Sequence, residues 1–184
     1  MLQAVFLDRD GVINSAFVRD GKPYPPKDIS ELHILPRVKL ALTALKDRGF
    51  CLVIVTNQPD VARGTADKKK VEEINNFLMQ ELPIDEIFVC YHDDRDDCSC
   101  RKPRPGSIYN AAEKYGIDLK KSYMIGDRWR DIEAGRNAEC QTIFIDRNYS
   151  EKKSPDFDYE VSCLFEAAVI ILGGNNYELS SMDK

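Results

Sequence analysis

The chain has 184 residues, of which 43% are hydrophobic and 31% charged, and its formal net charge is -5. This is the composition of a soluble globular domain with one buried core, and it argues against a protein that grips nucleic acid with a basic stripe. No apolar run approaches the roughly 20 residues that span a bilayer, and the N-terminal residues do not form a secretory signal, so we expect a cytoplasmic protein without membrane or nucleic-acid partners.

Five short apolar segments alternate with helical patterns along the chain. The apolar segments cover residues 4–7, 52–55, 87–89, 123–125 and 142–145. None of them alternates polar with apolar residues, which is typical of strands buried on both faces of a parallel sheet. Helices are expected at about 36–48, 66–81, 105–115, 129–137 and 161–172. The pattern predicts an α/β fold, a Rossmann-like three-layer sandwich with a mainly parallel sheet and helices on both faces.

Two polar stretches interrupt this alternation. Residues 14–35 are rich in Gly and Pro, and we expect a flap or long loop there. Residues 90–102 are rich in Asp, Cys and Arg and are expected to form a metal-binding loop. The whole pattern predicts a single domain over residues 1–172, followed by a polar tail at 173–184.

Polar side chains follow three of the predicted strands. Asp8 and Asp10 follow the first, Thr56 follows the second, and Asp127 follows the fourth. In open α/β sheets the carboxyl ends of the strands meet where ligands bind, so these side chains should cluster. Clustered carboxylates repel one another, and Mg²⁺ would relieve that repulsion while bridging a phosphate oxygen. The alternative is that the acids are ordinary turn residues, but their occurrence at several strand ends favours a magnesium site.

A second candidate metal site lies in the segment Cys-x-His-x5-Cys-x-Cys. Its members are three thiols and one imidazole, from Cys90, His92, Cys98 and Cys100. Four such ligands form the closed tetrahedral shell of a structural Zn²⁺ site, which would fold a loop that has almost no apolar residues. The alternative is a set of exposed thiols beside an incidental histidine.

Together these segments resemble the four motifs of the haloacid dehalogenase (HAD) superfamily. The matching segments are Asp8-Arg9-Asp10-Gly11-Val12, Thr56, Lys102 and Gly126-Asp127-Arg128-x-x-Asp131. The resemblance covers about residues 3–147. It implies a Mg²⁺-dependent phosphomonoesterase that acts on a small phosphorylated metabolite and forms an aspartyl-phosphate intermediate. It also implies a monomer. The segments between the motifs are too short for a large cap domain.

The resemblance implies a role for each of these residues. Asp8 would be the nucleophile, and Asp10 would protonate the leaving alcohol and then activate water. Mg²⁺ would bind the Asp8 and Asp127 carboxylates and the backbone carbonyl of Asp10, while Asp131 would orient the outer shell of the metal. The phosphoryl oxygens would be held by two further side chains, Thr56 and Lys102.

The run Cys-x-Cys-Arg-Lys-Pro resembles the HAD subfamily that contains heptose 1,7-bisphosphate 7-phosphatase and histidinol-phosphate phosphatase. Within that subfamily, the heptose bisphosphate is the first expectation for the substrate. The residues expected at the substrate are Asn57, Arg101 and Arg128. The chain departs from the heptose enzymes at Pro59-Asp60, and Asp60 offers a carboxylate for the amine of histidinol phosphate. A non-catalytic zinc-stabilised HAD-fold protein is a third possibility, disfavoured because both motif aspartates are present.

Overall fold

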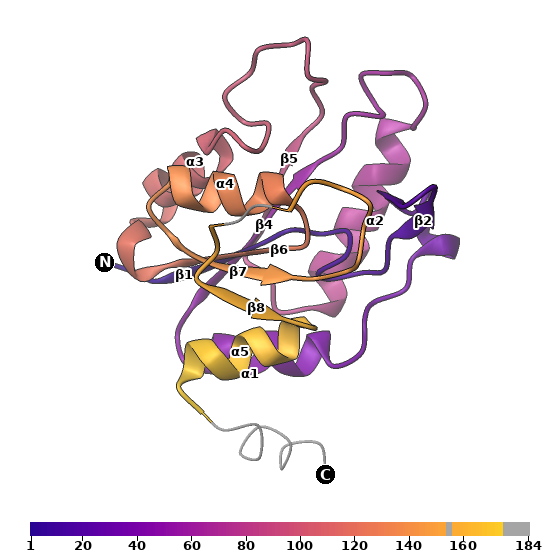
Figure 1. Cartoon of the computed structure of the whole chain (residues 1–184). Coiled ribbons are helices and arrows are strands. Elements are labelled where there is room, and N and C mark those ends of the chain that lie inside the picture. Colours follow the sequence, from indigo (N-terminus) through magenta and orange to yellow (C-terminus); the bar gives the residue numbers. More distant parts are fainter. Residues whose placement is uncertain (154–155, 175–184) are drawn as a thin grey trace.

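The computed structural model describes residues 1–153 and 156–174 and has a six-stranded parallel sheet at its centre (Figure 1). The strand order is β5-β4-β1-β6-β7-β8, and β1 pairs in parallel with β4 on one side and β6 on the other. The strands are β1 (Ala4–Leu7), β4 (Cys51–Asn57), β5 (Glu86–Cys90), β6 (Tyr123–Gly126), β7 (Gln141–Ile145) and β8 (Tyr159–Val161). The five predicted strands are confirmed, and β8 is an additional short edge strand.

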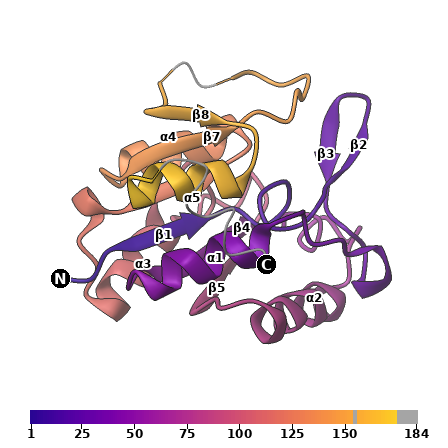
Figure 2. The same ribbon diagram turned by 90° about the horizontal axis from the view of Figure 1, so that it is seen from below.

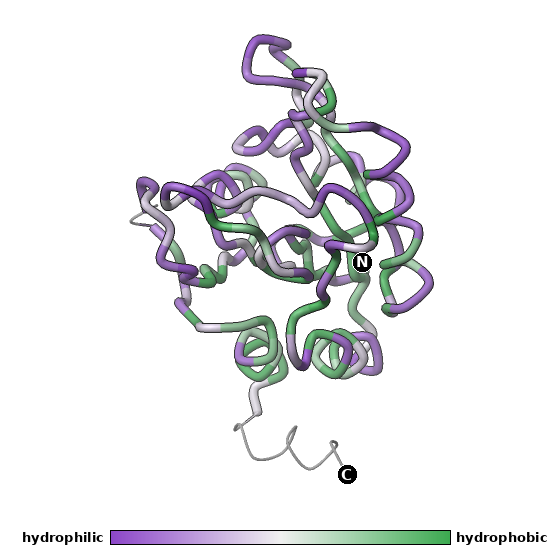
Figure 3. Tube along the Cα trace, turned by 90° about the vertical axis from the view of Figure 1, so that its right-hand side faces the viewer, coloured by the Kyte–Doolittle hydropathy of each residue, from purple (hydrophilic) through white to green (hydrophobic). Residues whose placement is uncertain are grey.

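Helices cover both faces of this sheet. Side chains that alternate along β1 point to opposite faces, with Val5 and Leu7 in one hydrophobic cluster and Ala4 and Phe6 in the other. The first cluster includes residues of α1 (Val38–Asp47), α2 (Lys68–Glu81) and α5 (Leu164–Leu172), and the second includes residues of α3 (Gly106–Tyr115) and α4 (Trp129–Asn137). Figure 1 shows α1 beside α5, away from α3 and α4, and Figure 3 shows hydrophobic residues concentrated in the interior. The predicted three-layer sandwich is therefore confirmed.

The ends of the helices differ slightly from the sequence expectation. A helix was expected from about residue 36, but α1 begins at Val38 because Arg37 adopts the left-handed conformation, with φ 62°. The Arg37 guanidinium lies over the Phe165 ring of α5, 3.3 Å from its centroid. At its C-terminal end, α3 is capped by Gly116, whose φ of 66° is the left-handed conformation that commonly stops a helix.

The two interrupting segments lie outside the layers. Residues 14–35 contain more structure than the expected loop, because β2 (Phe17–Arg19) and β3 (Lys22–Tyr24) pair as an antiparallel hairpin. This hairpin projects from the body of the domain (Figure 2). The segment between β5 and α3 also projects, as a loop without helix or strand (Figure 1). Neither of these two segments is a cap domain.

Some sequence expectations remain predictions. No helix in residues 1–153 and 156–174 is long and apolar enough to cross a membrane. Most of the predicted tail, from residue 175 onward, lies outside the described residues. The division into a domain and a tail, and the cytoplasmic location, therefore stay predictions.

Candidate active site

The carboxyl ends of three neighbouring strands meet at one edge of the sheet. β1 lies between β4 and β6, so the chain leaves β1 at a point where the strand order reverses, which is where ligands bind in such sheets. A cavity lies at this edge, and its inner residues include Asp8, Asp10, Thr56 and Lys102. Its wider rim includes Lys22, Tyr24, Arg63, Arg128, Arg130 and Glu151. The predicted clustering of the polar strand ends is thus what the fold produces.

Lys102 is a buried cation in contact with two of the carboxylates that line this cavity. Its Nζ lies 2.7 Å from Asp8 Oδ1 and 2.6 Å from Asp131 Oδ1, and it donates to the Val55 carbonyl at 2.6 Å. Burial alone would lower the pKa of Lys102, but the charges of Asp131 and Asp8 raise it. Burial raises the pKa of Asp8 to about 6, against the opposing effect of Lys102. The lysine therefore stays charged and shares its charge between two carboxylates.

Asn57 fixes the backbone at Lys102. Its Nδ2 donates to the Lys102 carbonyl at 3.1 Å, and its Oδ1 accepts from the Lys102 amide at 3.1 Å. These two bonds join the end of β4 to the loop that precedes α3. Asn57 also lines the cavity, so its side chain both borders the predicted substrate site and positions the buried lysine.

Asp127 is a buried carboxylate near the Tyr149 hydroxyl, which favours its charged form, but neither of its oxygens makes a hydrogen bond of good geometry within the described residues. Its side chain follows β6 and is 2% exposed. Carboxylate oxygens of Asp8, Asp127 and Asp131 lie within 4.8 Å of one another. Burial first, and then the neighbouring charges of Asp8 and Asp131, raise the pKa of Asp127 well above its ordinary value. An oxygen-seeking cation fits this arrangement because it would satisfy the two orphaned oxygens.

Gly11 makes room for that carboxylate. The residue has a φ of 91°, and a Cβ placed on it would lie 1.7 Å from Asp127 Oδ2. Any other residue at position 11 would therefore displace Asp127 as well as strain the backbone.

Asp131 connects helix α4 to the lysine. One carboxylate oxygen contacts Lys102, and the other accepts from the Arg128 amide at 3.0 Å, which caps the first turn of α4. The sequence prediction gave Asp131 a supporting position beside the metal, and its side chain does lie next to Asp8 and Asp127.

The two arginines predicted at the substrate lie in different surroundings. Arg128 borders the main cavity, where its guanidinium pairs with Glu151 at 2.5 Å and 2.9 Å. Arg101 does not belong to that lining among the described residues. Its Nε instead donates to Asp94 at 2.9 Å and its Nη1 donates to the His92 carbonyl at 3.3 Å, so it braces the metal loop.

Sequence reasoning missed two side chains of the site. They are Gln58, which holds Asp10, and Arg147, which lies in the loop after β7. Gln58 Nε2 donates both to Asp10 Oδ2 at 2.8 Å and to Thr56 Oγ1 at 2.9 Å. Arg147 donates to the Gly11 carbonyl at 2.9 Å from the loop after β7. The polar pair Asn57-Gln58, at and just after the end of β4, was a visible signal for Gln58, whereas nothing local in the sequence indicates that residue 147 reaches residue 11.

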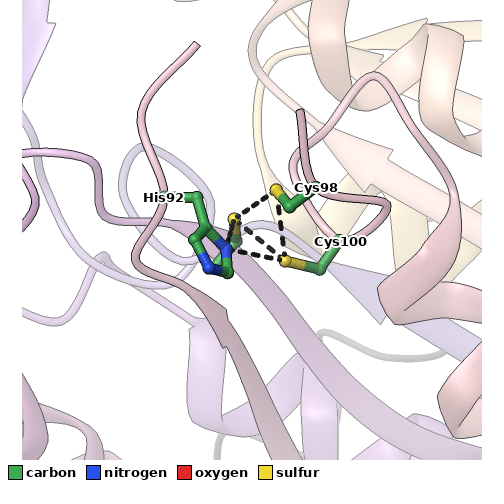
Figure 4. A group of neighbouring side chains, drawn as sticks. His92, Cys98 and Cys100 are labelled. Carbon is green, nitrogen blue, oxygen red and sulfur yellow. Dashed lines mark hydrogen bonds between the residues drawn. The ribbon is translucent and has the colours of Figure 1, made fainter. Parts of the chain in front are cut away.

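The four predicted zinc ligands meet at the base of the metal loop. Cys90 Sγ lies 3.2 Å from Cys100 Sγ and 3.7 Å from both Cys98 Sγ and His92 Nδ1. His92 Nδ1 is 3.4 Å from Cys100 Sγ, and Figure 4 shows His92, Cys98 and Cys100 directed toward one point. Ligands about 2.0–2.3 Å from a tetrahedral Zn²⁺ lie roughly 3.5–3.8 Å apart. The two 3.7 Å distances and the 3.5 Å distance between Cys98 and Cys100 fall in this range. The 3.4 Å and 3.2 Å distances to Cys100 fall just below it, so the cluster fits the ion after opening slightly.

Comparison with known proteins identifies the family of this chain. The family model for haloacid dehalogenase-like hydrolases matches residues 26–139, and the chain belongs to this family. A D-glycero-beta-D-manno-heptose-1,7-bisphosphate 7-phosphatase of Helicobacter pylori is 36% identical over 152 residues, covering 78% of this chain and 83% of the relative. A D-glycero-alpha-D-manno-heptose-1,7-bisphosphate 7-phosphatase of Campylobacter jejuni is 33% identical over 160 residues, covering 84% and 87%.

Solved structures give the same class. The D,D-heptose 1,7-bisphosphate phosphatase of B. bronchiseptica, solved with magnesium and phosphate, superimposes with a TM-score of 0.79 at 28% identity. The match covers 94% of this chain and 99% of that one. The predicted enzyme class, a phosphoric monoester hydrolase of the HAD type, is therefore confirmed.

Proposed function

We propose that this chain hydrolyses a phosphate monoester in two steps through an aspartyl-phosphate on Asp8. One observation carries the proposal: Asp8 lies on the floor of the cavity beside the charged Lys102, with Asp10 lining the same cavity two residues on. In the first step Asp8 attacks phosphorus while the bond to the substrate alcohol breaks. A carboxylate nucleophile makes one hard displacement into two easier ones.

Lys102 and Thr56 would hold the phosphoryl group. Both side chains are buried at the cavity floor, at 2% and 1% exposure, so their contacts are little screened by water. Phosphoryl transfer depends chiefly on positioning and on charge stabilisation, which one buried ammonium and one hydroxyl supply here. Asn57 contributes by holding the Lys102 backbone.

Asp10 would exchange protons with the alcohol and with water. In the first step it gives its proton to the leaving oxygen, and in the second it takes one from the water that attacks the aspartyl-phosphate. Its side chain is 15% exposed and lines the cavity, so it can reach a bound ester.

The magnesium ligands would be the Asp8 and Asp127 carboxylates and the Asp10 backbone carbonyl. The Asp127 oxygens support this assignment, because they are buried and make no hydrogen bond of good geometry within the described residues. Bound there, Mg²⁺ would offset the carboxylate charge and polarise the phosphoryl group. Asp131, already shared between Lys102 and the start of α4, would hold the surrounding groups in place.

The proposed substrate is D-glycero-D-manno-heptose 1,7-bisphosphate, hydrolysed at the 7-phosphate. The heptose phosphatase relatives support it. Of the cations that line the cavity, Lys22 would suit a second anionic group, whereas Arg63, Arg128 and Arg130 pair with neighbouring acids.

Histidinol phosphate is the weaker candidate because Asp60 has a partner. The Asp60 carboxylate lies 3.3 Å from the Arg63 guanidinium, which also contacts Asp93 at 2.5 Å. A carboxylate already paired with a cation has less to offer the amine of histidinol phosphate than a free one.

Comparing substrates directly tests this choice. We expect phosphate release from the heptose bisphosphate to exceed release from histidinol phosphate by about 100-fold or more in kcat/KM, as expected when a site is built for one set of polar groups. Both anomers of the heptose are assayed, with and without Mg²⁺. Faster hydrolysis of histidinol phosphate would keep the chemistry and replace the substrate.

We also propose that the cysteine cluster holds a structural Zn²⁺. The four ligand spacings support it, and four protein ligands leave no position for a substrate. The loop that the ion would fold continues directly into Arg101 and Lys102. Zinc would therefore position the phosphate-binding lysine without taking part in the chemistry.

Replacing Cys98 with Ser tests the zinc site. We expect loss of stoichiometric zinc and a Tm lower by roughly 5–15 °C, because structural zinc supplies folding free energy. The control is Cys163→Ser, which removes a thiol at the N-cap of α5, where serine is well tolerated. Metal analysis and thermal melts measure both variants. Full zinc content with a normal Tm in Cys98→Ser would contradict the assignment.

A further inference from the structure

The side chain of Arg9, between the two motif aspartates, is completely buried. Arg9 has 0% exposure and is the bulkiest of the fully buried residues. Arginine is almost never fully buried unless its charge is paired, so the partners of Arg9 indicate its role.

One end of the Arg9 guanidinium holds Asp10. Nη2 lies 3.0 Å from Asp10 Oδ2 and 3.2 Å from Oδ1, and Nε lies 3.3 Å from Oδ1. The planar guanidinium thus contacts both oxygens of the carboxylate, which fixes the direction of the carboxylate as well as its distance.

The other end of the guanidinium is anchored on helix α2. Nη1 donates to Asn75 Oδ1 at 2.8 Å, and Asn75 is 7% exposed on the inner face of that helix. The adjacent Asn76 is exposed. A buried polar side chain aimed at the guanidinium is costly unless the bond is made, so this contact ties Asp10 to the core through Arg9.

Two further donors complete the surroundings of Asp10. Asn14 Nδ2 donates to Oδ1 at 2.9 Å, and Gln58 Nε2 donates to Oδ2 at 2.8 Å. The carboxylate is therefore held from three sides, and its remaining exposed part borders the cavity.

We propose that Arg9 is a positioning residue for Asp10 and that Asn75 is the anchor of Arg9. The proposal rests on the proposed role of Asp10 in proton transfer. When Asp8 forms its bond to phosphorus, the electron pair of the breaking P–O bond passes to the alcohol oxygen. The Asp10 proton goes to that oxygen, and the carboxylate left behind is met by donors that are already in place.

This role predicts a dependence on the leaving group. An alkoxide leaving from a sugar needs the proton, whereas 4-nitrophenolate leaves well without one. Because kcat/KM reports the steps up to the first irreversible one, misplacing Asp10 should slow the sugar ester more than the aryl ester. General damage to the fold would slow both esters equally.

The experiment measures kcat/KM for the heptose bisphosphate and for 4-nitrophenyl phosphate, with Mg²⁺. The variants are Arg9→Met, which removes the guanidinium, and Asn75→Leu, which removes only the anchor. We expect Arg9→Met to lose about 10–100-fold on the sugar ester and about threefold or less on the aryl ester, since proton donation contributes on the order of 10²–10⁴-fold. Asn75→Leu should show the same pattern with a smaller loss.

The matched control is Asn76→Leu, the same change one residue along α2 on its exposed side. It should leave the ratio of the two kcat/KM values unchanged. Far-ultraviolet circular dichroism and Tm establish that each variant is folded, and Asn75→Leu keeps the test open if Arg9→Met does not fold.

An unchanged ratio in folded variants would overturn the positioning role, however large the loss of activity. That outcome differs from failure of the proposed function. If Asp8→Asn retained activity on both esters, the aspartyl-phosphate mechanism would fall whatever the Arg9 variants show.

Discussion

Replacing Asp8 with Asn will abolish phosphate release and leave the fold intact. The amide is a poor nucleophile with nearly the same shape, and loss of a nucleophile typically lowers kcat on the order of 10⁴-fold or more. Lys102 loses one partner but keeps Asp131 at 2.6 Å. Burial raises the pKa of Asp8 to about 6, so the ionised side chain costs stability in the metal-free protein. We therefore expect a Tm equal to or above that of the wild type.

Phosphate release and thermal melts are measured on the same preparations. The control is Asp47→Asn, the same chemical change at an exposed residue near the end of α1. It should keep full activity and a normal Tm. An Asp8→Asn protein that melts normally and still turns over would exclude Asp8 as the nucleophile.

The fold was predictable because its core strands are continuous apolar runs. Residues 4–7 are buried without exception, as a strand covered on both faces must be. The two hairpin strands and β8 were not predictable in this way. β2 and β3 are three residues each, mostly exposed, with Pro23 inside one strand, and β8 is three residues at the sheet edge. Short exposed strands of this kind carry no hydrophobic periodicity.

The reactive groups were predictable for a related reason. Asp8, Thr56 and Asp127 each lie at the end of a buried strand, and parallel strands bring those ends together. The residues that hold these reactive groups were not predictable, because their positions depend on contacts between segments that are distant in the sequence. Asn75 reaches Arg9 from a helix 66 residues away in the sequence, and nothing near either residue indicates the contact.

The direction in which a side chain points was also not predictable from the sequence. Arg101 stands beside Lys102 in the sequence, and the two were expected to face one site. The lysine side chain enters the core at 2% exposure, whereas the arginine turns toward Asp94 and the metal loop. Adjacent residues on irregular backbone need not share a face, so a motif identifies the lysine without fixing where its neighbour points.

Replacing Asp127 with Asn will have opposite effects on stability in the absence and presence of Mg²⁺. In the metal-free protein the buried Asp127 carboxylate makes no hydrogen bond of good geometry within the described residues and lies close to two other acids. The amide carries no charge, so the metal-free variant should melt several degrees above the wild type, at roughly 2–4 °C per kcal/mol. With saturating Mg²⁺ the wild type should gain about 3 kcal/mol at 100 times the Kd, and the variant should gain little. Its turnover should be lost.

The pH dependence of Tm in the metal-free proteins shows whether the Asp127 carboxylate stabilises or destabilises the fold. The pKa of Asp127 is raised in the folded state above its ordinary value of 3.8, so below about pH 4 the side chain is protonated whether the chain is folded or not, and it costs nothing. As pH rises, the unfolded chain releases the proton first, and the folded wild type loses stability that the Asn variant keeps. The Tm advantage of Asp127→Asn over the wild type in EDTA should therefore grow from pH 4 to pH 7.5, while Asp47→Asn shows no such trend. If Mg²⁺ stabilised the variant as much as the wild type, Asp127 would not be a ligand. If the metal-free variant melted below the wild type at pH 7.5, the orphaned carboxylate would be stabilised by something other than a metal ion.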